Sequence, residues 1–462
     1  MLTRFKEKYI GDAAFYKRYL YLALPMILQN AITNMVSFLD NIMVGQLGTE
    51  QMSGVAIVNQ LIFVYNLAIF GAASAASIFG AQYYGKGNHK GHMYSFRFKL
   101  YATLLVTGGA ILLFLTKGSA LISLYLTDTV GNGATDLALQ YGLEYLAIMM
   151  VGLIPFAVNQ SYATNIKETG QTFIPMLASF VAVGTNAILD YLMIFGIGPF
   201  PELGVQGAAL ATVIARYIEA LIVVIWAHIH RGKNRYLEGA YTGFGIPLAE
   251  LKAILIKGFP LMMNEVLWAA GMTTVTQCYS VRGLDVVAGL NIASTITNLF
   301  NIVYLQLGSC ISIVVGQYLG AGKLEDAKDA DNKMIVFSVF CCVIMAALMF
   351  VVGGFFPGIY NTTEEIRELA TSFIAVSAII MPFCAFSHAS YFTLRSGGKT
   401  VVTFLFDSVF TWVIVVPAAY LLAHFTGLGI VSIYFLVQGT ELIKVIIGYL
   451  MVKSNVWVVQ MV

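Results

Sequence analysis

The sequence predicts an all-α integral membrane protein with twelve transmembrane helices in two six-helix halves. Composition, the spacing of apolar runs and an internal repeat predict this fold class. Of the 462 residues, 58% are hydrophobic and only 11% are charged, and the mean hydropathy is +0.79. A water-soluble domain carries about 25% charged residues. The lipid bilayer is therefore the expected surrounding of most of the chain, and nucleic acid is not an expected partner.

Twelve apolar runs are bounded by Gly, Pro and charged clusters, and each is about 17 residues or longer, which suffices for a membrane-spanning helix. The first six runs cover residues 19–44, 54–82, 98–115, 137–160, 173–194 and 207–229. After a polar break, the other six cover residues 258–279, 286–318, 334–352, 366–392, 401–423 and 430–452. An even number of spans places both ends of the chain on the same side of the membrane.

The basic residues predict which side this is. Of the 26 Lys and Arg residues, 22 fall in the N-terminus, every second loop and the C-terminal end, a count that includes Lys99 and Lys444. The opposite loops hold Lys117, Arg282 and Arg367, and Arg216 lies inside the sixth run. Cytoplasmic loops carry the excess of Lys and Arg. We therefore expect a multi-pass protein with both termini in the cytoplasm.

An internal repeat relates the two halves. A constant shift that aligns Pro25 with Pro260 continues to the glycine-rich turns after Gln82 and Gln317. Agreement over more than sixty ungapped positions indicates a duplication. Because each half has an even number of spans, the copies are parallel repeats, which bind substrate between them. We expect an N-lobe of helices 1–6 in residues 1–235 and a C-lobe of helices 7–12 in residues 236–462.

Asp40 is the first candidate functional residue, because it lies inside the first apolar run. A carboxylate at this depth costs about 2.5 to 3.5 kcal/mol on insertion scales. On a helix, Thr33, Ser37 and Asp40 share one face. Charges inside membranes usually serve ions, protons or substrates. The alternative is a polar residue that only packs helices together.

The fifth run places Asn186 and Asp190 four residues apart, on one face of a helix. Amide and carboxylate oxygens at this spacing supply two ligands for a hard cation, and another helix supplies the rest. A carboxyl group here is also suited to carrying a proton, with Asp40 as a possible neighbour. The alternative is an Asn–Asp hydrogen bond that holds helices together.

The seventh run carries Asn264, Glu265 and Trp268 near its start. Glu265 aligns with Asn30 in the repeat, so the second half has its acid at a different depth from Asp40. Glu265 is a candidate for binding substrate or a proton, or it extends toward the membrane interface. Trp268 is able to stack against a planar cation, or it packs as a core residue.

Other polar residues at membrane depth, His388, Arg395 and Asp407, are interpreted as structural. The chain contains no Ser/His/Asp set, no H-E-x-x-H and no nucleotide-binding motif. The sequence therefore predicts neither an enzyme nor an ATP-driven pump. The glycine-rich stretches from Gly80 and from Gly316 are interpreted as tight turns that end long helices.

These motifs together resemble the multidrug and toxic compound extrusion (MATE) family of transporters, bacterial type, over essentially the whole chain. The resemblance depends on five motifs, one of which occurs twice: residues 39–48 around Asp40, the Gln-Tyr-x-Gly-x-Gly turn in both halves, Thr169-Gly170, Asn186 to Gly196, and Gly397-Gly398 before Asp407. It implies two six-helix lobes in a V shape that alternate access. It also implies a monomer in the bacterial inner membrane that needs no cofactor apart from its coupling ion.

The resemblance also implies roles for particular residues. Asp40, Asn186, Asp190 and Thr212 match the cation-binding and coupling site of the N-lobe, where Na⁺ is a possible ligand. Glu265, with Asn264 and Trp268 beside it, matches the seventh-helix site for substrate or proton. The deep acid that some members have in the tenth helix is absent here, since Glu364, Glu365 and Glu368 lie at its outer end.

The implied function is secondary active antiport, in which organic cations or drugs leave the cell in exchange for Na⁺ or H⁺. The alternative is a flippase for lipid-linked saccharide from the same MOP superfamily, which requires a strongly cationic central cavity. Nearly all basic residues of this chain fall in the predicted cytoplasmic loops, which favours the antiporter.

Overall fold

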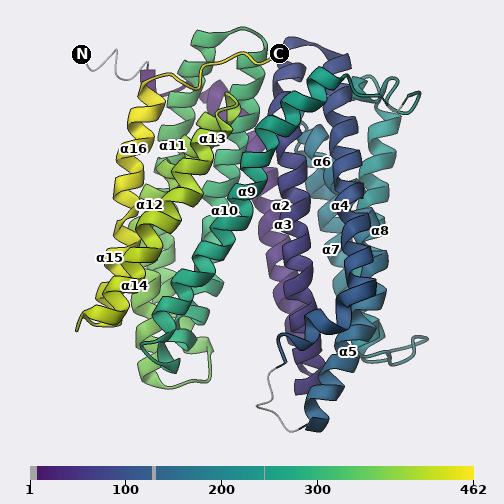
Figure 1. Ribbon diagram of the computed structural model, residues 1–462, viewed down its shortest axis with the longest axis vertical. Coiled ribbons are helices and arrows are strands. Elements are labelled where there is room, and N and C mark those ends of the chain that lie inside the picture. Colours follow the sequence, from purple (N-terminus) through teal and green to yellow (C-terminus); the bar gives the residue numbers. More distant parts are fainter. Residues whose placement is uncertain (1–7, 127–131, 244) are drawn as a thin grey trace. The chain divides into compact units, whose positions relative to one another are not determined.

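The computed structural model describes residues 8–126, 132–243 and 245–462, and within these ranges it is helical (Figure 1). The side chains of residues 36–39, 41 and 132–134 lie outside the described part, and with them the expected place of Ser37 on the same face as Asp40. The helices of the first half are α2 (Ala13–Gly45), α3 (Thr49–Lys86), α4 (His89–Ser123), α5 (Asn132–Val151), α6 (Leu153–Glu168), α7 (Phe173–Ile194) and α8 (Val205–Ile229).

The second half contains longer and shorter helices. They are α9 (Leu248–Ser280), α10 (Leu284–Gly320), α11 (Leu324–Gly353), α12 (Glu364–Ser396), α13 (Thr400–Phe404), α14 (Val416–Phe425), α15 (Ile430–Gly439) and α16 (Glu441–Lys453). Short 3₁₀ turns η1 (Arg235–Leu237) and η2 (Phe356–Ile359) lie in loops. Two π-helical segments, η3 (Leu405–Val409) and η4 (Thr411–Val415), join α13 to α14.

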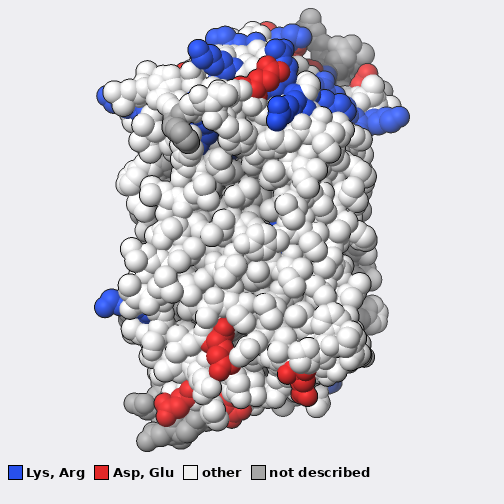
Figure 2. All heavy atoms as spheres, turned by 90° about the vertical axis from the view of Figure 1, so that its right-hand side faces the viewer, with Lys and Arg blue, Asp and Glu red and all other residues white. Residues whose placement is uncertain are grey.

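Within the described residues, ten helical segments are long and apolar enough to cross a membrane, and the bent pair of α5 and α6 makes an eleventh. α2 has 33 residues, and at about 1.5 Å per residue it is also long enough to span. The all-α membrane fold predicted from the sequence is therefore confirmed. On the face shown in Figure 2, most Lys and Arg side chains gather at one end, and a wide uncharged band separates them from acidic side chains at the other.

Three of the expected spans are less regular than the apolar runs suggested. The fourth run is broken at Gly152, where α5 and α6 meet at an angle of 44°. The eleventh run contains both π-helical segments, and the twelfth is interrupted at Thr440. The hydrophobicity of a run does not encode such breaks, because they leave the composition unchanged.

The chain forms two compact units, which we describe separately. The N-unit contains residues 28–80 and 89–252, and the C-unit contains the residues up to Ile27, residues 81–88 and residues 253–462. α2 and α3 thus contribute to both units. The expected division into lobes at residue 235 remains a prediction.

In the N-unit, α7 packs against α8, and α6 packs against both α4 and α8. One buried apolar cluster extends from Met43 through Tyr145 to Val213, and a second surrounds Phe96 and Tyr236. In the C-unit, α12 lies at the centre, because it packs against α10, α11 and α16 (Figure 1). These packed helices provide the rigid frame in which each polar group is held.

Two glycine turns cross inside the C-unit, where the end of α3 meets the end of α10. A Cβ atom added to Gly85 lies 2.0 Å from the carbonyl oxygen of Gln317, and one added to Gly320 lies 1.9 Å from that of Gln82. The internal repeat relates these two contacts to each other. Gly87 and Gly322 then adopt the left-handed backbone of a turn, with φ of 75° and 74°. The expected glycine turns are present, and the other two glycines allow the close crossing.

The C-terminal segment, residues 455–462, folds back over this crossing. The side-chain amide of Gln82, which is fully buried, donates to the carbonyl oxygens of Ser396 at 2.9 Å and Val459 at 3.2 Å. Its oxygen accepts from the backbone N–H of Met461 at 2.8 Å. Gln82 therefore joins the first half of the sequence to the end of the chain.

Candidate functional site

The predicted cation site lies entirely in the N-unit, on α2, α7 and α8. Asp190 is 1% exposed, and no described group donates a hydrogen bond of normal geometry to either of its carboxylate oxygens. The Oδ1 atom of Asp40 is also buried and has no hydrogen-bond partner among the described residues. The two carboxyl groups interact with each other. Two interacting carboxyl groups in a dry site favour a shared proton or a bound cation, because it is unfavourable for both to be charged and unpaired there.

Asn186 and Thr212 complete the set of four oxygen-bearing residues. Asn186 is buried beside Asp190, one helical turn earlier on α7. Its side-chain Nδ2 lies 3.5 Å from Thr212 Oγ1 on α8, which is the outer limit of a hydrogen bond. The amide nitrogen thus points at the hydroxyl, which leaves the amide oxygen for another partner.

The donor set fits a hard monovalent cation or a proton. It offers two carboxylates, an amide oxygen and a hydroxyl, which are ligands that alkali and alkaline-earth ions prefer. Among the described residues, no group of three or more His, Cys, Asp or Glu side chains is arranged to hold a metal ion.

The second predicted site lies in the C-unit, on α9. Asn264 is 2% exposed, and its amide nitrogen lies 3.1 Å from Asp407 Oδ2. The hydroxyl and the backbone N–H of Ser408 donate to the amide oxygen of Asn264, at 2.8 Å and 3.3 Å. Glu265 is half-buried, and Trp268 is 38% exposed. The structure thus joins Asn264 to the eleventh-run residues Asp407 and Ser408.

Asp407 also forms an ion pair that the sequence analysis missed. Lys444 Nζ on α16 lies 2.7 Å from Asp407 Oδ1, and its side chain is 8% exposed. Counting Lys444 among the basic residues at the end of the chain was therefore wrong. The flexible ammonium group of Lys444 is turned inward because Asp407 needs a partner in an apolar environment.

Glu219 on α8 is a further half-buried acid that the sequence analysis did not single out. The hydroxyl of Ser179 on α7 donates to its carboxylate. Gln29 Nε2 on α2 in turn donates to Ser179 Oγ at 2.7 Å. An acid inside the sixth apolar run is the same signal that identified Asp40, so Glu219 was identifiable from the sequence although the sequence analysis did not name it.

Lys99 on α4 was likewise counted as a loop residue, but it is fully buried. Its ammonium group lies 2.5 Å from Glu168 Oε1 on α6, and it also donates to Asn165. His92 Nε2 lies 3.3 Å from the other oxygen of Glu168. This group ties α4 to α6 at the end of the N-unit and pairs the charge of Lys99 with that of Glu168.

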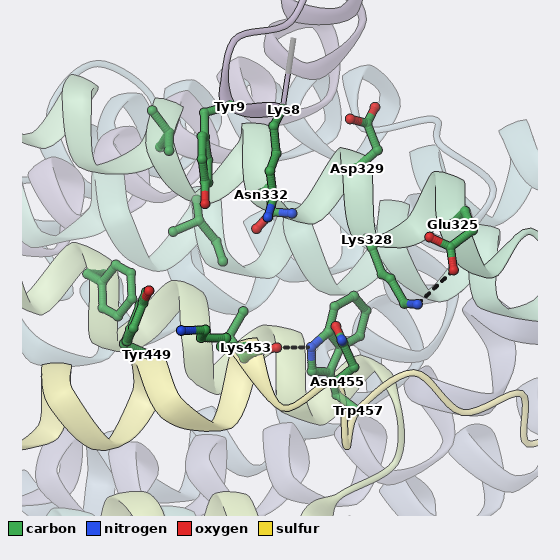
Figure 3. Close-up of a pocket in the computed structure, with 14 residues that line it drawn as sticks. Lys8, Tyr9, Glu325, Lys328, Asp329, Asn332, Tyr449, Lys453, Asn455 and Trp457 are labelled. Carbon is green, nitrogen blue, oxygen red and sulfur yellow. Dashed lines mark hydrogen bonds and ion pairs between the residues drawn. The ribbon is translucent and has the colours of Figure 1, made fainter. Parts of the chain in front are cut away.

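A cavity of about 490 Å³ opens at the end of the C-unit near the C-terminal segment (Figure 3). Among its lining residues, Lys328 pairs with Glu325 at 2.7 Å, and Trp457 donates to the carbonyl oxygen of Val452 at 3.1 Å. No residue predicted for ion or substrate binding lines it. The cavity is therefore separate from the predicted sites.

The fold and the carboxyl groups buried inside its spanning helices are those of a membrane transporter. A model of the MatE family matches residues 25–192 and residues 260–421. The chain therefore belongs to the MatE family, whose members are transporters and not enzymes. The matched segments begin at Pro25 and Pro260, the same pair that the sequence aligns, which confirms the internal repeat.

Curated relatives and solved structures agree with this assignment. The chain is 23% identical over 418 residues to a probable multidrug resistance protein NorM of Thermotoga maritima, covering 90% of this chain and 87% of the relative. It is 25% identical over 426 residues to the corresponding protein of Listeria innocua, covering 92% and 91%. Identity at this level leaves the substrate of this chain open.

The fold matches solved structures closely. A multidrug resistance MATE family transporter of the MOP superfamily, in an outward-facing conformation, aligns with a TM-score of 0.86 at 20% identity, over 96% of both chains. A MOP superfamily transporter from Pyrococcus furiosus aligns with a TM-score of 0.85 at 19% identity, also over 96% of both chains. These similarities establish the fold.

Proposed function

We propose that this protein is a secondary active antiporter that exports organic cations or drugs in exchange for Na⁺ or H⁺. The names of the curated relatives support efflux of drugs. The observation that carries the proposal is the pair of carboxyl groups, Asp40 and Asp190, whose buried oxygens lack hydrogen-bond donors among the described residues. Such a pair requires a positive charge, and an entering ion or proton supplies it.

Asp40, Asn186, Asp190 and Thr212 form the coupling site of this proposal. Binding of the ion removes the repulsion between the carboxylates and draws together α2, α7 and α8, which carry them. An ion shifts a conformational equilibrium only by its difference in affinity for the two states. Ion binding therefore drives release of substrate if the cation-loaded site is more stable in the conformation that releases substrate than in the other conformation. Glu265 and Trp268 are proposed to contact the substrate cation.

Efflux of a fluorescent organic cation from proteoliposomes tests the proposal, under an imposed Na⁺ gradient and, separately, an imposed pH gradient. We expect Asp40→Asn and Asp190→Asn each to lower ion-driven efflux at least tenfold, because a neutral amide no longer attracts the ion. Asp285→Asn is the matched control, since Asp285 is exposed in the first turn of α10. Full ion-driven efflux in both site variants contradicts the coupling site, and no response to either gradient in the wild type favours the flippase.

The orientation of the chain is also part of the proposal, with both termini in the cytoplasm of a bacterial cell. Two exposed loop glycines, Gly232 and Gly358, have open space around them and make a matched pair for labelling. Intact cells treated with a membrane-impermeant maleimide are expected to label Gly358→Cys and not Gly232→Cys. The reverse pattern contradicts the proposed orientation.

A further inference from the structure

The C-unit has no counterpart of the cation site. The register of the repeat changes along the chain: it aligns Pro25 with Pro260 at α2, Lys167 with Arg395 before α7, and Val205 with Ile430 at the starts of α8 and α15. In these three registers, Asp40, Asn186, Asp190 and Thr212 correspond to Val275, Ile414, Ala418 and Val437. All four oxygen-bearing residues are thus replaced by apolar ones.

The third register, which begins at Val205 and Ile430, places three buried positions of α8 on three buried positions of α15 and α16. It aligns the buried residues Ala208, Val223 and Ala227 of α8 with Ile433, Gly448 and Val452, which are also buried. Val275 and Val437 belong to the buried apolar cluster of the C-unit, at 4% and 2% exposure. Two of the four corresponding positions in the C-unit are therefore filled by buried apolar side chains.

The same registers relate a second pair of polar clusters. Gln29, Ser179 and Glu219 of the N-unit correspond to Asn264, Asp407 and Lys444 of the C-unit. Each cluster is linked by hydrogen bonds from the first helix of its half to the fifth and from the fifth to the sixth. The acid of the sixth helix in one half is a base in the other.

Both carboxylate oxygens of Asp407 already have a partner within hydrogen-bond distance. Lys444 Nζ contacts one carboxylate oxygen at 2.7 Å, and the amide of Asn264 contacts the other at 3.1 Å. Ser408 holds the amide in place through its hydroxyl and backbone N–H. Glu441 lies one helical turn before Lys444, and Glu265 lies beside Asn264, but neither is an ion-pair partner of Lys444 within 4.0 Å.

We propose that Lys444 is the resident cation of the C-unit. Its ammonium group forms an ion pair with the carboxylate of Asp407. Without this lysine, the carboxylate binds an alkali-metal ion or a small ammonium ion. The C-unit therefore takes no coupling ion, and the ion of each transport cycle binds in the N-unit alone. This inference rests on the proposed antiport, since it assigns the coupling ion to one unit.

Removal of the lysine head group tests the inference. Lys444→Met retains an apolar side chain of similar length and exposes the carboxylate of Asp407 to a replacement cation. The purified variant is heated in detergent with ethylammonium chloride, with NaCl, or with choline chloride at equal ionic strength. We expect ethylammonium or Na⁺ to raise its Tm by about 2 °C or more over choline.

The double variant Asp407→Asn/Lys444→Met is the matched control, because it has no carboxylate at this place. We expect no rise of Tm over choline in this variant. An equal rise in both variants, or none in Lys444→Met, overturns the inference.

A second measurement keeps Lys444 in place, so it remains decisive if Lys444→Met fails to fold. Asp190→Asn removes the N-unit site and leaves the C-unit intact. We expect its Tm to be the same in ethylammonium, Na⁺ and choline. A rise with either ion reveals a site for a mobile ion in the C-unit and overturns the inference. Failure of the antiport proposal is a separate result, since it is measured as absent ion-driven efflux in the wild type.

Discussion

The ends of α3 and α10 make the same contact in both directions, whereas the polar clusters in the middle of the two halves differ in charge. At the helix ends, Gly85 meets Gln317 and Gly320 meets Gln82, backbone against backbone. In the polar clusters, Glu219 is held by a serine hydroxyl, and Lys444 is held by a carboxylate. The contrast teaches that two crossing backbones leave no room for a side chain. A charged residue inside the helices, by comparison, can be exchanged for one of opposite sign if its partner changes with it.

The largest effect is expected from a side chain placed in the crossing. Gly320→Val puts Cβ within 1.9 Å of the Gln82 carbonyl oxygen, and backbone atoms cannot yield as a flexible side chain does. We expect a loss of about 3 kcal/mol or more, with little folded protein. The monodisperse fraction in size-exclusion chromatography measures it. Gly108→Val is the control, because the space around Gly108 is open, and similar yields for both variants contradict the prediction.

The second test compares the two charges directly. Lys444→Gln leaves Asp407 buried without its cation, which costs about 3 to 5 kcal/mol. Glu219→Gln keeps an oxygen that accepts from Ser179, so we expect a loss of about 1 kcal/mol. Thermal unfolding of the purified variants measures both. Asp407→Asn should restore much of the stability of Lys444→Gln, and equal losses in the two single variants are inconsistent with the difference in pairing.

The third test concerns the C-terminal segment that covers the crossing. Gln82→Ala removes three hydrogen bonds, to Ser396, Val459 and Met461, and we expect a loss of about 1 to 3 kcal/mol. We also expect faster cleavage of the segment by carboxypeptidase. Gln46→Ala, at an exposed position, is the control. Unchanged cleavage means that other contacts hold the segment.

The smallest effect is expected at Thr212. Thr212→Val gives the N-unit the residue that the C-unit has at Val437. The contact with Asn186 is long, at 3.5 Å, so we expect only about a threefold rise in the ion concentration for half-maximal efflux. Ion titration of proteoliposome efflux measures it. A loss as large as that of Asp190→Asn means that Thr212 is a principal ligand.

Hydrophobicity and repeat length were sufficient to predict the membrane fold and the duplication. Long apolar runs separated by charged loops have few other stable arrangements in a bilayer. The breaks at Gly152 and Thr440 were not predictable, because glycine and threonine occur in many unbroken spanning helices. The repeat was visible in the sequence only where the two halves align without gaps. That Glu219 and Lys444 occupy corresponding positions in the two halves was therefore found only from the structure.

The site was predicted where an acid lies deep in an apolar run, as Asp40 and Asp190 do. Lys99 and Lys444 were misplaced because each lies near the end of its run, where a lysine normally reaches water. Their partners, Glu168 and Asp407, are 69 and 37 residues away. A contact over such a distance depends on helix packing, which one sequence does not specify.

The C-unit contains residues 81–88 from the first half of the chain, which has a consequence for synthesis of the protein. The end of α3 is translated half a chain earlier than its partner Gln317. At about 5 to 20 residues per second, this delay lasts roughly 10 to 50 s. During that time the glycine-rich end of α3 has been inserted but has no helix to cross. The segment of residues 455–462, which covers the crossing, is translated later still, so the order of synthesis leaves this end of the C-unit uncovered until that segment has been made.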